Sequence, residues 1–193
     1  HGLRFTASGA RIYGRSFDDK IKVWDSENGN ELKFNGGLSN LGGIGDMHIS
    51  NDGGQIITGL KNNSVILWDI KNGKKSAVLN EKEEDKVVSA GIEKIGITRV
   101  LFGEDGKHIY ASSADNRIMI WNKDTGKKDL MELDNRNTFL LNIAVSPNEE
   151  YMVSSHVSKG LLGYKIDEDL RRSGLTFLTL WDLSSGKIIK KIN

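Results

Sequence analysis

Four tryptophans stand at equivalent places in four similar segments, and this repetition constrains the fold more than any other feature of the chain. An alternating apolar run ends in each tryptophan and is followed by Asp or Asn: IKVWD, VILWD, IMIWN and FLTLWD. The tryptophans are Trp24, Trp68, Trp121 and Trp181, and the glycines five residues after them are Gly29, Gly73, Gly126 and Gly186. A short unit repeated four times predicts an architecture in which each copy buries its faces against its neighbours.

Each unit also contains further short apolar segments separated by turns. First strands are expected at 3–5, 47–49, 99–102 and 143–145, and second strands at 11–16, 55–60, 108–113 and 151–156. The tryptophan segment supplies a third strand, and a fourth follows the repeated glycine. Period-2 alternation with glycine-containing turns predicts all-β antiparallel meanders and no amphipathic helix.

The amino-acid composition limits which kinds of partner the chain is expected to bind and in which compartment it is expected to lie. Lys and Arg total 27 and Asp and Glu total 26, so a net charge of +1 gives no electrostatic reason to bind nucleic acid or an anionic membrane. No apolar run approaches the roughly 18 residues that a membrane-spanning helix needs. The absence of cysteine excludes disulfides and thiolate sites and is compatible with a reducing compartment, so we expect an intracellular, cytoplasmic location.

Taken together, these segments resemble the WD-repeat β-propeller family over nearly the whole chain. The resemblance implies four blades of four antiparallel strands in one propeller subdomain, 1–193, as an open arc or a partial propeller. The expected blades are about 1–36, 44–80, 97–132 and 139–193, with insertions at 80–96 and 157–174. Because the chain begins at His1, it is expected to be part of a longer propeller. A ring completed by a second copy or another protein, and a closed four-bladed ring, remain alternatives.

In this family, each blade carries a polar network of a Ser or Thr eight residues before the tryptophan, an Asp six before it and a loop histidine. The residues that the resemblance assigns to this structural network are Ser16, Asp18 and Trp24, then Trp68, then Ser113, Asp115 and Trp121, and finally Trp181. The second unit departs from the pattern, with Leu60 and Asn62 at those positions, and an insertion splits the fourth unit. No unit has a clear loop histidine, so the second and fourth blades are expected to be less rigid at their turns.

Nothing in the sequence indicates catalysis. The glycine-rich stretch 35–45 precedes a strand rather than a helix, which favours a loop between blades over a phosphate-binding loop. The four histidines, at positions 1, 48, 108 and 156, show no ligand spacing and no paired Asp or Glu. We therefore expect no catalytic residues, no metal ion and no cofactor.

The predicted function is a non-enzymatic scaffold that binds other proteins. By family topology, both insertions and the turns between second and third strands share one face of the propeller. The candidate partner-binding residues there are Phe17 and Lys61 in the turns, and Tyr164, Arg171 and Arg172 in the longer insertion. One alternative is an assembly element that completes a ring, including self-association through open propeller ends. The other is a regulatory propeller of a larger, multidomain protein, an enzyme included.

Overall fold

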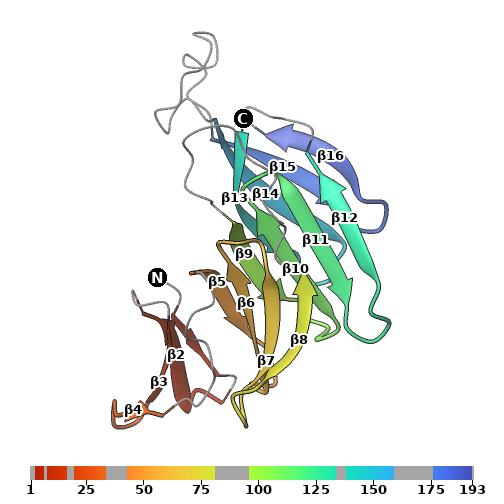
Figure 1. The fold of residues 1–193 in the computed structure, drawn as a ribbon. Coiled ribbons are helices and arrows are strands. Elements are labelled where there is room, and N and C mark those ends of the chain that lie inside the picture. Colours follow the sequence, from red (N-terminus) through yellow and green to blue (C-terminus); the bar gives the residue numbers. More distant parts are fainter. Residues whose placement is uncertain are drawn as a thin grey trace. The chain divides into compact units, whose positions relative to one another are not determined.

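A computed structural model describes residues 3–6, 8–16, 20–33, 43–80, 96–133, 138–158 and 176–192. These residues form sixteen strands in four four-stranded antiparallel sheets, and the described ranges contain no helix (Figure 1). The chain divides into two compact units, His1–Phe102 and Gly103–Asn193, with the division in the hairpin that follows β9. The all-β, four-strand meander expected from the sequence is confirmed.

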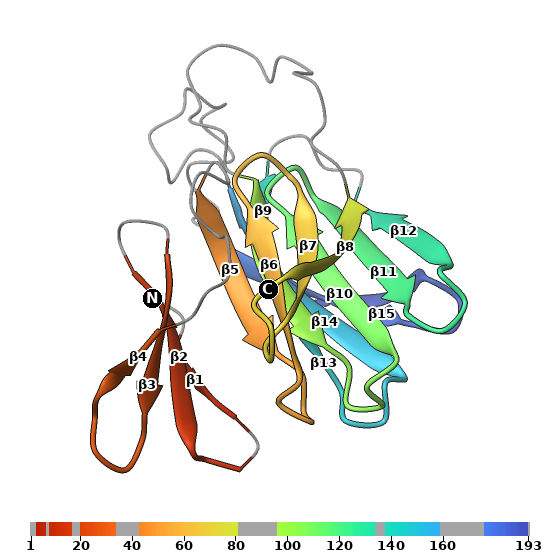
Figure 2. The same ribbon diagram turned by 60° about the horizontal axis from the view of Figure 1, so that its bottom comes forward.

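The first two sheets lie in the first unit. The first sheet consists of β1 (Leu3–Phe5), β2 (Arg11–Arg15), β3 (Ile21–Asp25) and β4 (Glu31–Leu32). The second consists of β5 (Ile44–Ile49), β6 (Gln55–Leu60), β7 (Val65–Asp69) and β8 (Lys75–Asn80). In both sheets the spatial order of the strands is their order in the chain (Figure 2). Buried side chains such as Tyr13, Val23, Met47, Ile56 and Trp68 form the core of this unit.

The third and fourth sheets repeat the same meander. The third consists of β9 (Ile97–Phe102), β10 (His108–Ser113), β11 (Arg117–Asn122) and β12 (Lys128–Glu132). The fourth consists of β13 (Thr138–Val145), β14 (Tyr151–Ser158), β15 (Thr176–Asp182) and β16 (Lys187–Ile192). Fully buried side chains in the second unit include Ile109, Ile118, Met119, Leu140 and Trp181.

The repeated Trp-Asp and glycine positions have one local explanation. The Asp or Asn after each tryptophan ends the third strand, and its side-chain Oδ1 accepts backbone N–H groups from the turn that follows. The acceptors are Asp25, Asp69, Asn122 and Asp182. The glycine four residues after this Asp or Asn has a left-handed backbone in each turn, with φ between 67° and 74°. A side chain is disfavoured there, so this turn geometry accounts for the glycine of the motif.

Several strand boundaries differ from the sequence prediction: β5, β9 and β13 begin at Ile44, Ile97 and Thr138 rather than at 47, 99 and 143. The second strand of the fourth unit was expected to end at His156, but β14 continues through Val157 and Ser158. These two residues are buried and pair with Phe139 and Thr138 of β13, which itself begins earlier than expected. Cross-strand pairing extends the hairpin, and the insertion therefore begins after Ser158.

Candidate functional site

The Ser and Asp residues predicted for the polar network lie at or near the turns between second and third strands. Ser113 is buried at the end of β10, whereas Asp115 is exposed. The Asp115 carboxylate pairs with Arg117 two residues later, with Oδ2 at 2.6 Å from Nη2 and 2.8 Å from Nε. Ser16 is half-buried directly after β2, and Asp18 lies outside the described residues. Asp115 thus ties together its own turn.

The tryptophans differ in burial and in their hydrogen-bond partners. Trp68, Trp121 and Trp181 are buried, while Trp24 is half-buried. The ring of Trp121 lies beneath the ammonium of Lys128, whose Nζ is 5.4 Å from the ring centroid. These positions leave little indole surface for stacking a ligand in the second, third and fourth sheets.

Trp68 and Trp181 donate their indole N–H to a hydroxyl on the neighbouring strand. Trp68 Nε1 lies 2.9 Å from Thr58 Oγ1, and Trp181 Nε1 lies 2.7 Å from Ser154 Oγ. In each sheet the hydroxyl residue is two positions beyond the residue paired with the tryptophan, so the two side chains share one face. In the second sheet the hydroxyl therefore lies ten residues before the tryptophan, rather than eight.

The hydroxyl in the fourth sheet continues into a buried histidine chain. Ser154 Oγ lies 2.7 Å from His156 Nε2, and His156 Nδ1 lies 3.4 Å from Asn116 Oδ1. Asn116 donates its Nδ2–H to the carbonyl of Thr138 at 2.9 Å, which fixes Oδ1 toward the histidine. The proton order follows: Trp181 donates to Ser154, Ser154 donates to Nε2, and Nδ1–H donates to Asn116. The imidazole ring of His156 is therefore neutral, and every donor in this series of hydrogen bonds has an acceptor.

Sequence reasoning missed the role of His156. The position four residues beyond the tryptophan's cross-strand partner holds Ser16, Leu60 and Ser113 in the other three sheets, so no repeat pattern indicates a histidine there. The serine–histidine–asparagine order resembles that of a nucleophilic triad. However, Ser154 and His156 are fully buried, the serine already accepts the indole N–H, and the ring stacks on Phe177 at 4.9 Å. The arrangement supports the sheet and is closed to a substrate.

Buried neutral histidines predict a loss of stability in acid. Burial lowers the pKa of His156 to about 4 from 6.5, and burial with the charges of Arg4 and Arg99 lowers that of His48 to about 4. His48 Nδ1 also accepts the N–H of Phe102 at 3.2 Å, which requires an unprotonated nitrogen. Because the unfolded chain binds these protons first, the free energy of unfolding decreases as the pH falls from about 6.5 to about 4.

This pH dependence can be measured by urea unfolding. Protonation of the unfolded chain at His156 alone should lower the free energy of unfolding by about 2 kcal/mol between pH 7 and pH 5. The variant His156→Gln cannot titrate and should show a smaller decrease over the same interval. An equal decrease in the variant and the original chain would contradict the assignment.

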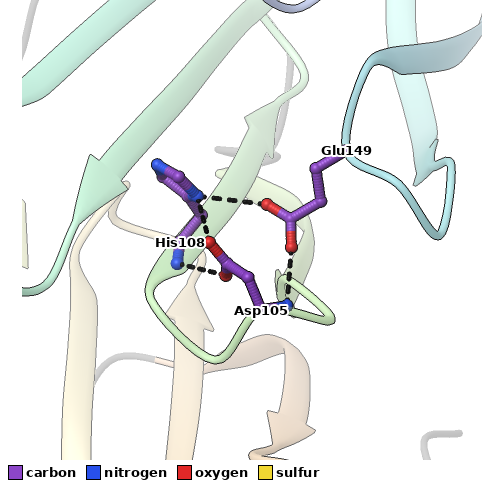
Figure 3. A group of neighbouring side chains, drawn as sticks. All are labelled: Asp105, His108 and Glu149. Carbon is purple, nitrogen blue, oxygen red and sulfur yellow. Dashed lines mark hydrogen bonds and ion pairs between the residues drawn. The ribbon is translucent and has the colours of Figure 1, made fainter.

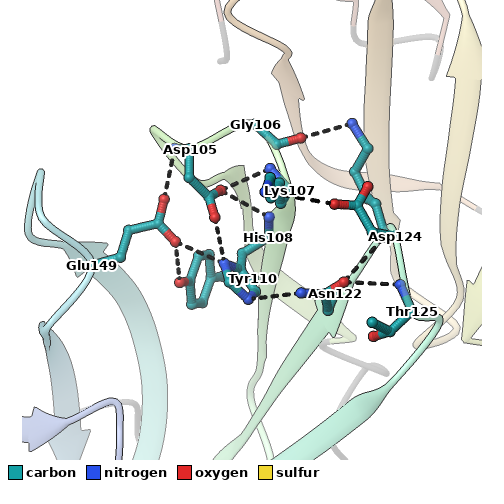
Figure 4. Close-up of polar contacts among 10 residues, drawn as sticks. Asp105, Gly106, Lys107, His108, Tyr110, Asn122, Asp124, Thr125 and Glu149 are labelled. Atoms are coloured by element: carbon teal, nitrogen blue, oxygen red, sulfur yellow. Dashed lines mark hydrogen bonds and ion pairs between the residues drawn. The ribbon is translucent and has the colours of Figure 1, made fainter.

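A second polar cluster joins hairpin turns of the third and fourth sheets (Figure 3). His108 Nδ1 lies 2.8 Å from Asp105 Oδ2 and 3.1 Å from Glu149 Oε2. Glu149 also accepts the backbone N–H of Asp105 at 2.8 Å and the hydroxyl of Tyr110 at 2.7 Å. On the other side of the ring, Nε2 lies 3.3 Å from Asn122 Nδ2. Figure 4 shows the full set of contacts.

Burial makes the carboxylate of Glu149 the centre of this cluster. Its side chain is 12% exposed, whereas those of Asp105 and His108 are about one-third exposed. Burial, and then the hydrogen bond to Glu149, raises the pKa of Tyr110 well above its usual range, so the phenol remains a donor. Backbone N–H groups of His108 and Lys107 outweigh partial burial and lower the pKa of Asp105. Both carboxylates are thus held as acceptors.

The cluster corrects one expectation from the sequence. His108 was expected to have no acidic partner, but the structure gives it two, Asp105 three residues earlier and Glu149 41 residues later. The three donor atoms lie within 4.8 Å of one another, and one imidazole with two carboxylates is a donor set that Zn²⁺ accepts. Asp105 and His108 could have been noticed as a local pair, but the contribution of Glu149 depends on the packing of two hairpins. All three of these metal-binding groups already take part in hydrogen bonds with one another.

The predicted partner-binding residues lie largely outside the described residues. Phe17, Tyr164, Arg171 and Arg172 are not among them. Lys61 is described: it is exposed in the turn between β6 and β7, and its backbone N–H donates to the carbonyl of Gly43 at 2.9 Å. Within the described ranges, no helix is long and apolar enough to cross a membrane.

Four meanders of consecutive antiparallel strands, each with a tryptophan near the end of its third strand, define a repeat protein built from β-propeller blades. Residues 91–122, which include β9 to β11, match the family described as WD domain, G-beta repeat. The chain thus contains a WD-repeat match, and its other three meanders repeat the same strand pattern. It is similar to autophagy-related protein 16 of Arabidopsis thaliana, with 23% identity over 190 residues, 97% of this chain and 31% of that protein. The chain therefore spans about a third of the length of this relative.

Proposed function

We propose that this chain is a non-enzymatic protein–protein interaction module that presents one loop-bearing face to a partner protein. The observation that supports this is the distribution of connection lengths. In each sheet, the first hairpin and the turn after the tryptophan are short and lie at one end. The long connections, 33–43, 81–96 and 159–175, leave from the opposite end because consecutive strands are antiparallel. Loops on a rigid scaffold are common binding sites.

Lys61 lies at the loop-bearing end of the second sheet, in the tight turn between β6 and β7. Phe17 holds the corresponding sequence position in the first unit, just after Ser16. We propose that Phe17 and Lys61, with Tyr164, Arg171 and Arg172 of the long insertion, contact the partner. Tyrosine and arginine contribute strongly to many protein interfaces, and an aromatic side chain in a turn offers a large apolar contact.

Substitution of the two proposed anchors should weaken binding without unfolding the chain. The partner is first identified by affinity capture with the full chain from its source cells, and its Kd is then measured. Phe17→Ala and Arg171→Ala should each raise the Kd about 10-fold, because interface anchors contribute more than 1 kcal/mol. Lys71→Ala is the control, because Lys71 is exposed in a turn at the opposite end of the second sheet.

The thermal midpoints of these variants distinguish contact residues from core residues. Each should remain within a few degrees of the original chain. A loss of more than roughly 2 kcal/mol in Phe17→Ala would place this side chain in the core. An unchanged Kd in both anchor variants, with a weakened Lys71→Ala, would assign binding to the other end of the sheets.

The exposed apolar surface favours a second candidate, an assembly element. In the fourth sheet, Leu178 and Ile192 are 38% and 42% exposed and pair directly across β15 and β16, and Tyr151 at the other end of β14 is 42% exposed. On β1, Leu3 and Phe5 are 66% and 63% exposed. We propose that such a surface associates with another copy or with another chain to complete a ring. Light scattering across a concentration series should then show an oligomer, and a monomer throughout would exclude self-association.

The likeness to an autophagy-related protein supports the interaction role rather than an enzymatic one. We propose an autophagy-related assembly as the setting in which the partner is sought. Because the chain spans about a third of that relative, a regulatory role within a larger protein belongs to the same proposal.

A further inference from the structure

The first hairpin turn of the third sheet departs from the other three. In each of those, a Ser or Thr opens the turn and its Oγ accepts the backbone N–H five residues later. The pairs are Thr6 with Arg11, Ser50 with Gln55 and Ser146 with Tyr151, at 3.2, 2.9 and 3.0 Å. The third sheet has Gly103 at this position, and Asp105 accepts the N–H of His108 instead, at 3.0 Å.

The same turn of the fourth sheet departs in a second way. Its fourth residue needs a left-handed backbone, and the first three sheets have Gly9, Gly53 and Gly106 there, with φ between 68° and 72°. The fourth sheet has Glu149, with φ of 53°. A side chain in this region costs about 1 kcal/mol relative to glycine. This conformation brings the carboxylate of Glu149 against the third sheet's turn.

The first two departures fit each other. A Cβ at Gly103 would lie 2.5 Å from Oε1 of Glu149 and 2.8 Å from its Cδ. The serine or threonine found in the other turns would therefore exclude the carboxylate. Glycine at 103 provides the space that Glu149 occupies, and Glu149 supplies an acceptor for the N–H of Asp105.

The third departure is the residue after the tryptophan, which is Asp in three sheets and Asn122 in the third. Oδ1 of Asn122 accepts the backbone N–H groups of Asp124 and Thr125, at 3.0 and 2.9 Å. These two bonds determine the orientation of the amide, so its Nδ2 is the atom that faces His108 Nε2. An amide nitrogen is a donor only, and Nε2 must therefore be an acceptor.

The tautomer of His108 follows from this contact. With a lone pair on Nε2, the proton lies on Nδ1, where Asp105 and Glu149 both accept it. A metal ion at Nδ1 would need the proton on Nε2, directed at the donor of Asn122. The side chains of Asp105, His108 and Glu149 thus have the composition of a metal-binding site. A proton on His108 Nδ1 occupies the place where the metal ion would bind.

We infer that Asn122 is a positioning residue, because it keeps the proton of His108 on Nδ1, where it links Asp105 and Glu149 across two hairpin turns. Asn122→Asp would move this proton to Nε2, and the three side chains would then form a binding site for a divalent metal ion. The aspartate would keep the two backbone hydrogen bonds, as Asp25 does in its own turn. Its second oxygen would accept a hydrogen bond from Nε2–H, which leaves the lone pair of Nδ1 directed toward the two carboxylates. A carboxylate behind a metal-binding histidine is a recurring arrangement in zinc sites.

The experiment compares zinc binding by the full chain and its variants in mildly alkaline buffer. Calorimetry with Zn²⁺ and visible absorption with Co²⁺ should show at least about 10-fold tighter binding in Asn122→Asp than in the original chain. The double variant Asn122→Asp with Glu149→Gln is the control, and it should lose this gain if the metal lies at the cluster. Equal affinity in the original chain and Asn122→Asp would overturn the inference.

Nitrogen-15 NMR of the imidazole tests the tautomer without any substitution. The original chain should show a protonated Nδ1 and an unprotonated Nε2 at His108. A proton on Nε2, alone or together with one on Nδ1, would contradict the role assigned to Asn122. This measurement decides the matter even if Asn122→Asp fails to fold.

Discussion

Gly45→Ala is expected to lower the free energy of unfolding by about 3 kcal/mol, because its new Cβ would meet a backbone atom rather than a movable side chain. Gly45 lies at an irregularity in β5, and the position of its Cβ overlaps the carbonyl oxygen of Ile97 in β9. A Cβ at Gly59, on β6, would also lie 2.7 Å from the Cβ of Ile97. The two glycines therefore allow β9 to approach the second sheet.

Urea unfolding of Gly45→Ala and a matched glycine variant would measure this effect. Gly54→Ala is the control, because Gly54 is exposed and its Cβ would meet only side-chain atoms of Asp52, at 3.3 Å or more. The control should stay within about 0.5 kcal/mol of the original chain. A loss below about 1 kcal/mol in Gly45→Ala would show that β5 and β9 do not approach in this way.

Ser154→Ala is expected to cost about 3 kcal/mol, because the hydroxyl is shared by two buried groups. Its removal leaves the indole N–H of Trp181 and Nε2 of His156 without the partners that they have at 2.7 Å. Each buried polar group left unsatisfied costs about 1 to 3 kcal/mol, and these groups are 2% and 0% exposed.

The neighbouring serine provides the control for this substitution. Ser155 is half-buried and points to the opposite face of β14, so Ser155→Ala should change the free energy of unfolding by about 0.5 kcal/mol or less. The indole N–H resonance of Trp181 should shift in Ser154→Ala and stay in place in Ser155→Ala. If the two variants were equally stable, the hydroxyl of Ser154 would not contribute to this hydrogen-bond network.

The fold was predictable because its signals are local. The Asp or Asn after each tryptophan and the glycine four residues beyond it are determined by one turn, and the strands between turns alternate with period two. The polar network was less predictable. The spacing implied by the family pointed to Ser113 and Asp115. It did not point to Thr58 and Ser154, which accept the indole N–H groups of Trp68 and Trp181 and whose positions follow from strand register.

Contacts between sheets could not be predicted from local patterns. His156 meets Asn116 across 40 residues, and His108 meets Glu149 across 41. Each pair becomes neighbours only when a turn of one sheet packs against a strand or turn of another. Gly103, Asn122 and Glu149 are visible in the sequence as departures from the repeat. That all three belong to one cluster around His108 could be recognised only in the packed structure.

The strictly sequential order of strands has a consequence for how the chain closes its loops. Among the described strands, each sheet consists of four consecutive strands, so every connection within a sheet joins two paired neighbours without a crossover. The connection 159–175 is about four times as long as the connection 61–64. The entropic cost of closing a loop grows only with the logarithm of its length, by about 0.6 kcal/mol for each doubling. Lengthening that connection thus costs roughly 1 kcal/mol. A blade can therefore accept a long insertion between its second and third strands while the rest of its hairpins keep their register.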